Sequence, residues 1–145
     1  MRIVYIAGRY RHYNADGTLN LPRMAEEVAD EARWAVAVAR AGHFWIAPLH
    51  NSIQVAALDS GIADMHYVDG DLALIGLLRP RYDGLLLRPG WRRRGAADSR
   101  PEWYPAGELN GSQGAAAEYR LAQQRGLVIL EPISIGHSRV LEVLN

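Results

Sequence analysis

Short apolar runs alternate with longer segments along this chain, and that alternation restricts the fold more than any other feature of the sequence. The first run ends at a glycine and predicts a buried strand, about Ile3 to Ala7. Further strands are predicted in the segments HFWIAP, YDGLLLRPG and LVILEP. Strands that alternate with helices favour a parallel sheet with helices on both faces. We therefore expect one α/β domain over residues 1–145, with a parallel sheet of four to five strands.

Helices are predicted from apolar spacing and from start and stop residues. The first runs from Pro22 to Ala41, because proline is tolerated in a first helical turn and Gly42 provides a stop. Its inward face carries Met24, Val28, Ala32, Ala35, Val36 and Ala39. We expect Trp34, near Ala37 and Val38, on an exposed flank that could join a subunit interface.

Three more helices are expected along the rest of the chain. They are predicted over Val68 to Leu78 with Asp69 near the start, over Ser112 to Arg125 with Gly126 as the stop, and over His137 to Leu144. The segment LHNSIQVAALDSGIADMHY is interpreted as a long mixed connection. The segment 92–111 is rich in charge, glycine and proline and lies between a strand and a helix, where α/β proteins bind ligands. It is predicted to be a lid or binding loop, and a disordered insertion is the alternative.

Composition limits the classes of partner. Sixteen basic and sixteen acidic residues give a net charge of zero, which argues against a nucleic-acid polymer or a membrane surface as partner. The chain has no cysteine, and its five histidines lack metal-binding spacing, so no metal site is predicted. The first residues form too short an apolar run for a signal peptide, and no stretch is long enough to span a bilayer. A cytoplasmic protein is the resulting expectation.

Glu118 is the one acidic residue in the stretch NGSQGAAAEYRLAQQRG, and helical spacing places it on the inward side. A buried carboxylate without a partner is costly, so its placement indicates a cavity, a partner or chemistry. The side chain should lean over Gly114 and Ala115, which leave open space. The alternative is a structural glutamate at the helix edge, paired with an arginine, with Ser112 as an ordinary N-cap. Its neighbours on the helix are small or apolar, whereas the opposite side carries Gln113, Arg120, Gln123 and Gln124.

Asp71 is a second acid on an apolar helix face, which it shares with Leu74, Ile75 and Leu78. The alternative is an acid in a first helical turn that stabilises the helix dipole. Two acids on apolar faces together suggest a nucleophile and a second acid that orients or protonates.

Four motifs in order resemble the nucleoside 2-deoxyribosyltransferase superfamily: YIAGRY after the first strand, DLALI, DGLLLRPGW on the third strand, and SQGAAAE. The resemblance runs from about Arg2 to Pro132 and extends to the branch of 2′-deoxynucleoside 5′-phosphate N-hydrolases. It implies a flavodoxin-like (Rossmann-like) three-layer sandwich that cleaves an N-glycosidic bond. It also implies a homodimer or higher homo-oligomer. No metal or organic cofactor is expected, because a carboxylate and a departing base suffice.

The resemblance also implies residue roles. Glu118 matches the family's catalytic glutamate, which attacks the anomeric carbon and forms a glycosyl-enzyme ester. Asp71 matches the aspartate beside it that helps handle the leaving base. Gly8 and Tyr10 match the turn after the first strand, where an aromatic ring stacks on the nucleobase. The alternative for Tyr10 is a loop aromatic that fills a surface groove.

Two further positions bear on the substrate. Arg9 stands where the family turn usually has proline; it could contact a phosphate, but we expect it to face water. His50 follows the second strand and could face the pocket, and a structural or surface histidine is the alternative.

Ser112 bears on which branch of the superfamily the chain resembles. At the matching position, transferases that act on free nucleosides carry an aspartate. In the N-hydrolase branch, the resemblance implies a serine that binds the 5′-phosphate. A carboxylate would repel a phosphate, whereas a hydroxyl at a helix N-terminus can donate to it. Ser112 is therefore a predicted substrate-binding residue, as is Gly114, which leaves room at the same helix end.

Three functions stay open at this point. The preferred one is an N-glycosidase that hydrolyses a nucleoside 5′-monophosphate. A second is a deoxyribosyltransferase that moves the sugar to another base. The third, from another class, is a nucleotide-binding module without catalysis. The sequence does not distinguish the base or the sugar.

Overall fold

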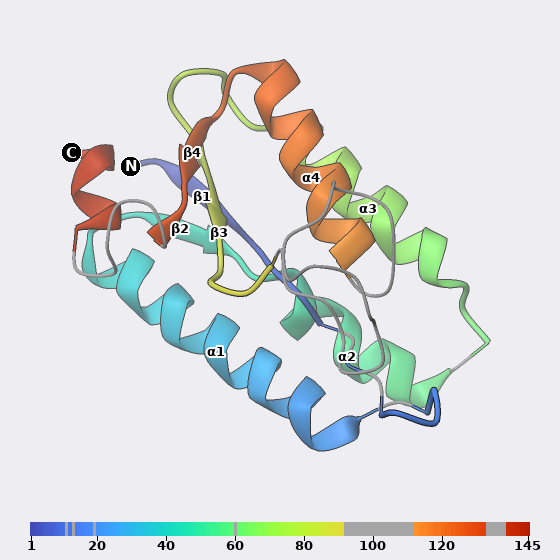
Figure 1. Cartoon of the computed structure of the whole chain (residues 1–145). Coiled ribbons are helices and arrows are strands. Elements are labelled where there is room, and N and C mark those ends of the chain that lie inside the picture. Colours follow the sequence, from blue (N-terminus) through green and yellow to red (C-terminus); the bar gives the residue numbers. More distant parts are fainter. Residues whose placement is uncertain (11, 13, 19, 60, 92–111, 133–138) are drawn as a thin grey trace.

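A four-stranded parallel sheet forms the centre of the molecule (Figure 1). The computed structural model describes residues 1–10, 12, 14–18, 20–59, 61–91, 112–132 and 139–145. The strands pair in the order β2-β1-β3-β4, and every pairing is parallel, which confirms the expected α/β class. Their bounds are β1 (Ile3–Ala7), β2 (Phe44–Ile46), β3 (Gly84–Leu87) and β4 (Val128–Leu130).

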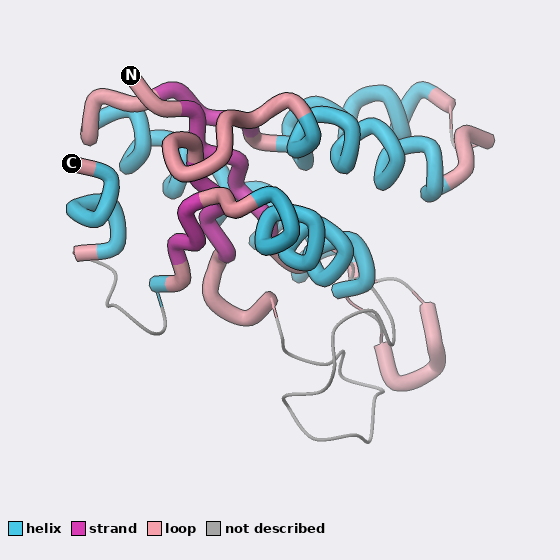
Figure 2. The backbone as a smooth tube through the Cα atoms, turned by 90° about the horizontal axis from the view of Figure 1, so that it is seen from above, coloured by secondary structure: helices cyan, strands magenta, loops and turns pink. Residues whose placement is uncertain are grey.

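Helices surround these strands (Figure 2). The α-helices are α1 (Leu21–Arg40), α2 (Pro48–Leu58), α3 (Asp64–Gly76) and α4 (Ser112–Arg125), and a 3₁₀-helix, η1 (Val140–Leu144), lies near the end of the chain. The predicted helix over Ser112 to Arg125 is confirmed, and α1 agrees with its prediction to within one residue at each end. Gly42 and Gly126 follow these two helices with φ of 84° and 69°, the left-handed conformation that ends a helix at glycine.

Each face of the sheet has its own apolar core, because successive strand residues point to opposite faces. Tyr5 of β1 faces α3 and α4, where Ile75 and Ala122 are fully buried. Val4 and Ile6 face α1 and η1 on the other side. The segments that carry Asp71 and Glu118 therefore cover the face to which Tyr5 points.

The predicted inward face of α1 is wrong in part. Trp34 and Val38, expected on an exposed flank, are buried in the core at 7% and 0% exposure, whereas Val36 is 49% exposed. The true buried stripe runs through Met24, Glu31, Ala35 and Val38, at helical spacing. Because this stripe includes a glutamate, a search for apolar residues alone selects a face of α1 that is rotated about the helix axis from the buried one.

The segment between β2 and β3 also differs from expectation. Helix α2 occupies the first part of what was interpreted as a mixed connection. Helix α3 begins at Asp64, four residues before the predicted start, so Asp69 lies within the helix instead of near its beginning. The residue before α3, Ala63, has no side-chain cap, which explains why the sequence gives no start signal there.

Two further expectations concern the loop at 92–111 and the absence of membrane-spanning segments. The predicted lid at 92–111 lies outside the described residues, so it stays a prediction. Among the residues that are described, no helix combines the length and apolar character needed to cross a membrane.

Candidate functional site

Glu118 lies on the buried side of α4, as its spacing predicts. Its side chain is only 6% exposed, and the Tyr5 hydroxyl donates a hydrogen bond to its Oε1 at 3.0 Å. Gln123 and Gln124 on the opposite side of the helix are exposed. The alternative of an edge glutamate paired with arginine is wrong: Glu118 is buried, and no ion pair to it occurs within the described residues. The carboxyl group is therefore held by a neutral donor.

Asp71 approaches the same centre from α3, which packs beside α4 (Figure 1). It lies seven residues after Asp64, the first residue of the helix, or about two turns into it. The alternative role of a first-turn acid that stabilises the helix dipole is therefore wrong. The nearby Tyr5 hydroxyl lowers the pKa of Asp71 and so favours its ionised form, although burial has the larger, opposite effect.

Burial and mutual repulsion raise the pKa values in this cluster, which we call the carboxyl cluster: Tyr5, Asp71 and Glu118. Burial, followed by the charge of Asp71, raises the pKa of Glu118 to about 8, although the hydrogen bond from Tyr5 opposes that rise. Burial raises the pKa of Asp71 to about 6. Burial also raises the pKa of Tyr5 above its ordinary value, followed by the charges of Glu118 and Asp71. Because the two carboxyls interact, the pair holds about one proton at pH 7.

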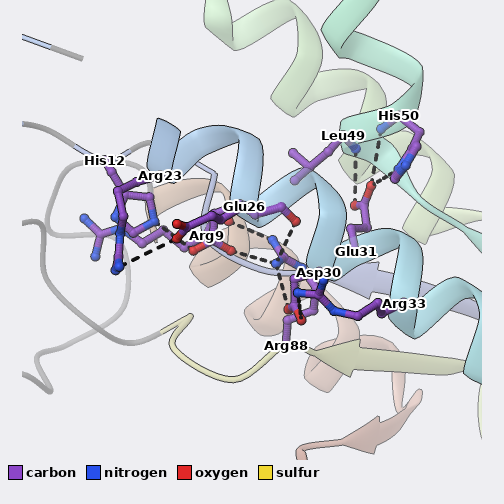
Figure 3. A network of polar contacts seen from close by, with 11 residues as sticks. Arg9, His12, Arg23, Glu26, Asp30, Glu31, Arg33, Leu49, His50 and Arg88 are labelled. Atoms are coloured by element: carbon purple, nitrogen blue, oxygen red, sulfur yellow. Dashed lines mark hydrogen bonds and ion pairs between the residues drawn. The ribbon is translucent and has the colours of Figure 1, made fainter. Parts of the chain in front are cut away.

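Glu31 of α1 is a buried acid, at 1% exposure, whose charge acts on the carboxyl cluster. Its oxygens accept hydrogen bonds from the backbone N–H groups of Leu49 and His50, at 3.2 Å each, and lie 2.7 Å from His50 Nδ1 (Figure 3). Glu31 thus caps the start of α2 from another helix, and a negative charge is favourable there. Burial raises the pKa of Glu31 above its ordinary value, and the hydrogen bond with His50 offsets only part of that rise. Its charge adds to the raised pKa values of Asp71 and Glu118.

His50 also lines a hollow of about 570 Å³ beside the edge strand β2. The hollow is mainly apolar, and Leu74, one helical turn after Asp71, contributes to its wall. The structure therefore gives His50 both a structural partner, Glu31, and a position on a cavity wall. The other lining residues are Ala32, Ala35, Phe44, Trp45, Ile46, Ala47 and Asn51.

The turn after β1 contacts a buried arginine that follows β3. A Cβ atom at Gly8 would lie 2.6–2.7 Å from three atoms of the Arg88 guanidinium, so only glycine fits at this approach. Arg9 is 3% exposed, so the expectation that it faces water is wrong. Tyr10 is half-buried after it, which leaves its predicted stacking role untested.

The start of α4 contains the predicted phosphate site. Ser112 is the first residue of the helix, and its side chain lies outside the described part of the structure. A Cβ atom at Gly114 would meet no described atom within 4 Å beyond its own helix, which agrees with the expected open space. Ala115, expected to leave space as well, is buried at 2% exposure in the core.

Sequence reasoning missed three residues of this region. Tyr5 is part of an apolar strand, and its hydroxyl is the signal that could have identified it, because a buried tyrosine needs a polar partner. Glu31 was missed because the predicted inward face of α1 did not include it. Arg88 belongs to the segment YDGLLLRPG, which was predicted as a strand, and it follows β3 directly in the structure. Each belongs to an element far from Glu118 in sequence.

Scans against protein-family models, curated proteins and solved structures found no match for this chain. Among the described residues, no group of three or more histidine, aspartate and glutamate side chains is arranged to hold a metal ion.

Proposed function

We propose that this protein is an N-glycosidase that cleaves the bond between base and sugar in a nucleoside 5′-monophosphate. The observation that supports it most directly is the carboxyl cluster: Glu118 of α4 accepts a hydrogen bond from the buried Tyr5 hydroxyl, and Asp71 of α3 is close enough for its charge to raise the pKa of Glu118. The parallel sheet is compatible with the flavodoxin-like fold that the motif resemblance implies.

The proton content of the pair suits this reaction. Cleavage with a covalent intermediate needs one ionised carboxylate as nucleophile and one proton for the leaving base. Glu118 attacks C1′, the C1′–N bond breaks, and its electron pair stays with the base, which takes up a proton from Asp71. Water then attacks C1′ of the ester and loses a proton to Asp71. Sugar phosphate is released and Glu118 is a carboxylate again.

Tyr5 supports the attacking carboxylate by donating a hydrogen bond to Oε1. Positive charge that develops on the sugar in the transition state also favours the ionised form of both acids. The role of the tyrosine is thus to hold Glu118 in place and to oppose the effect of burial on its pKa.

The reverse assignment, with Asp71 as nucleophile and Glu118 as acid, is favoured by one observation. Glu118 has the higher pKa, about 8 against about 6, and so holds the proton more strongly in the free protein. Mass spectrometry of protein quenched during turnover, followed by peptide mapping, separates the two. A sugar ester on the peptide that contains Glu118 supports our assignment, whereas an ester on Asp71 supports the reverse.

The substrate class is tested with matched pairs of nucleosides and their 5′-monophosphates. We expect a kcat/KM at least about tenfold higher for the monophosphates, because a phosphate gains several charge-assisted hydrogen bonds at a helix N-terminus. Faster release of base from free nucleosides would contradict the phosphate assignment. Chromatography of the released base provides the measurement.

Two other functions are separated by the products. A base exchange activity would convert an added second base into a new nucleotide, whereas hydrolysis yields free sugar phosphate. A binding module without catalysis would release no base, and Glu118→Gln would then keep both nucleotide binding and any biological effect. We also propose, from the resemblance, that the protein forms a homodimer or larger homo-oligomer and, from the short apolar run at its first residues, that it is cytoplasmic.

A further inference from the structure

The Arg88 guanidinium connects three segments that are far apart in sequence. It is 1% exposed, and its Nη2 donates to the carbonyl oxygen of Arg9 at 2.7 Å. On the other side, Nη1 donates to Glu27 Oε2 at 2.7 Å and to Asp30 Oδ2 at 3.2 Å, both on α1 (Figure 3). Glu27 Oε1 in turn lies 2.7 Å from His12 Nε2. The turn after β1, the end of β3 and one face of α1 therefore share a single buried cation.

The close approach of the Arg88 guanidinium to Gly8 shows that this contact depends on a glycine in the turn. Any side chain at Gly8 would overlap the guanidinium, and the Arg88 backbone N–H donates to Ala7 at 2.8 Å. The main chain from Ala7 to Arg9 is thus held from both the backbone and the side chain of one residue. A planar group with several donors suits this task, and lysine cannot replace it.

Arg88 is also a cation that acts on the carboxyl cluster. Within the described structure, the side chains that act on the pKa of Glu118 are Asp71 on α3, Tyr5 on β1, Glu31 on α1 and Arg88 after β3, and Arg88 is the positive one of these four. It favours the charged form of Glu118, whereas Asp71 and Glu31 oppose it. Nothing in the proposed chemistry requires Arg88 to touch the sugar or the base.

We infer that Arg88 is a positioning residue of the candidate site: its buried guanidinium fixes the turn after β1 against α1 and places a positive charge beside the carboxyl cluster. The inference deepens the proposed function and rests on it for the kinetic readout. The structural readout, the ionisation of Glu118, does not depend on any activity.

The test compares Arg88→Met, Arg88→Lys and the control Arg33→Met. Arg33 pairs with the same Asp30 at 3.4 Å, but 70% of its side chain is exposed. Carbon-13 NMR follows the carboxyl of Glu118, assigned by its loss in Glu118→Gln, across the pH range. We expect Arg88→Met to raise the pKa of Glu118 by about one unit, because it removes a positive charge that favours the carboxylate form. Arg88→Lys and Arg33→Met should leave that pKa unchanged.

The kinetic arm separates position from charge. Arg88→Lys keeps the charge but loses the fork of donors, so we expect KM for a nucleoside 5′-monophosphate to rise roughly tenfold while the pH limb of kcat stays in place. In Arg88→Met the limb that reports ionisation of Glu118 should move to higher pH. An unchanged pKa of Glu118 in Arg88→Met, or an unchanged KM in Arg88→Lys, overturns the inference.

Folding and function are controlled separately. If Arg88→Met does not fold, Arg88→Gln replaces it, because glutamine can still donate to the carbonyl of Arg9. If neither neutral variant folds, KM of Arg88→Lys decides. If the wild-type protein releases no base from any nucleotide, the proposed function fails, and the NMR titration still decides whether Arg88 controls Glu118.

Discussion

Two buried acids, Asp83 and Glu118, lie on neighbouring elements and are treated by the fold in opposite ways. Asp83 precedes β3 and is 0% exposed, and its oxygens accept hydrogen bonds from Ile3 N, from Arg79 N and from the Arg79 guanidinium, all within 2.8–2.9 Å. Burial raises the pKa of Asp83, but the bonds from Arg79 and Ile3 more than offset it, so the pKa lies below its ordinary value. Glu118 has one neutral donor and an acidic neighbour.

The difference separates an acid whose charge is fixed by hydrogen bonds from one whose protonation changes near neutral pH. Asp83 joins the start of β1 to the start of β3, at the end of the sheet opposite the turn of Gly8 and Arg88. A full set of donors makes its charge permanent. Glu118 stays near the point where it can gain or lose a proton at neutral pH, which is typical of catalytic acids. Ionisation of Asp83 therefore stabilises the folded protein, whereas ionisation of Glu118 costs folding stability.

The largest expected effect is on activity. Glu118→Gln should lower base release from a nucleoside 5′-monophosphate by about a thousandfold or more, because it removes the nucleophile. Asp83→Asn should leave kcat within about twofold at a temperature where the variant is folded, since Asp83 is far from the reacting atoms. A release assay with circular dichroism as the folding check gives the comparison, and equal losses in both variants would abolish the distinction between the two acids.

The next effect concerns stability, and its pH dependence should have opposite signs. The pKa of Glu118 rises from 4.5 to about 8 on folding, so ionisation costs stability progressively between those pH values. Glu118→Gln removes this cost and should be more stable than wild type at pH 8.5, by on the order of 4 kcal/mol at most, and similar to it near pH 4.

Asp83→Asn should behave in the reverse way. Its folded-state pKa lies below the ordinary 3.8, so its stabilisation is present above that pH and is lost as the pH falls through the folded value. The variant should be less stable by about 2 kcal/mol at pH 7 and should approach wild type as the pH falls below the folded-state pKa of Asp83. Urea unfolding at several pH values measures both differences, and a Glu118 variant that is destabilised at high pH would contradict the raised pKa.

The sequence predicts the elements whose signals are local. Helix α4 ends at Arg125, because Gly126 after it adopts positive φ, and β1 is a continuous apolar run, so both were predicted with their observed bounds. Helix α2 was missed because the group that caps it is the carboxylate of Glu31, on another helix. A start signal that lies 18 residues away in sequence is visible only after the chain has folded.

The candidate site was predictable to the same extent. Helical spacing alone placed Glu118 inward, because its neighbours at i±3 and i±4 are small or apolar. Spacing could not reveal Tyr5 or Arg88, since their roles arise when β1 and β3 pair and bring distant residues together. The misplaced start of α3 also made Asp71 look like a first-turn acid, although it lies within the helix.

A smaller effect is expected from Tyr5→Phe, which removes the donor to Glu118 and keeps the ring in the core. The pKa of Glu118 should rise by about one unit, and kcat at pH 7 should fall roughly tenfold, because a smaller fraction of the nucleophile is ionised. Tyr119→Phe is the matched control on α4, since its hydroxyl accepts from Gln123 on the exposed side. Carboxyl NMR and the pH profile of kcat test the prediction, and a wild-type profile in Tyr5→Phe would show that the hydroxyl is only a packing group.

The smallest effect is expected from Glu31→Gln, and its sign is the informative part. Glu31 raises the pKa values of both Glu118 and Asp71 through its charge, so neutralising it should lower both, by about half a unit. Glutamine keeps one oxygen to accept from Leu49 and His50, so α2 retains part of its cap. Glu26→Gln, at an exposed position of α1, should change neither pKa. If carboxyl NMR shows both values unmoved in Glu31→Gln, Glu31 resembles Asp83 more than Glu118: it is an acid that holds two helices together and leaves the carboxyl cluster to set its own protonation.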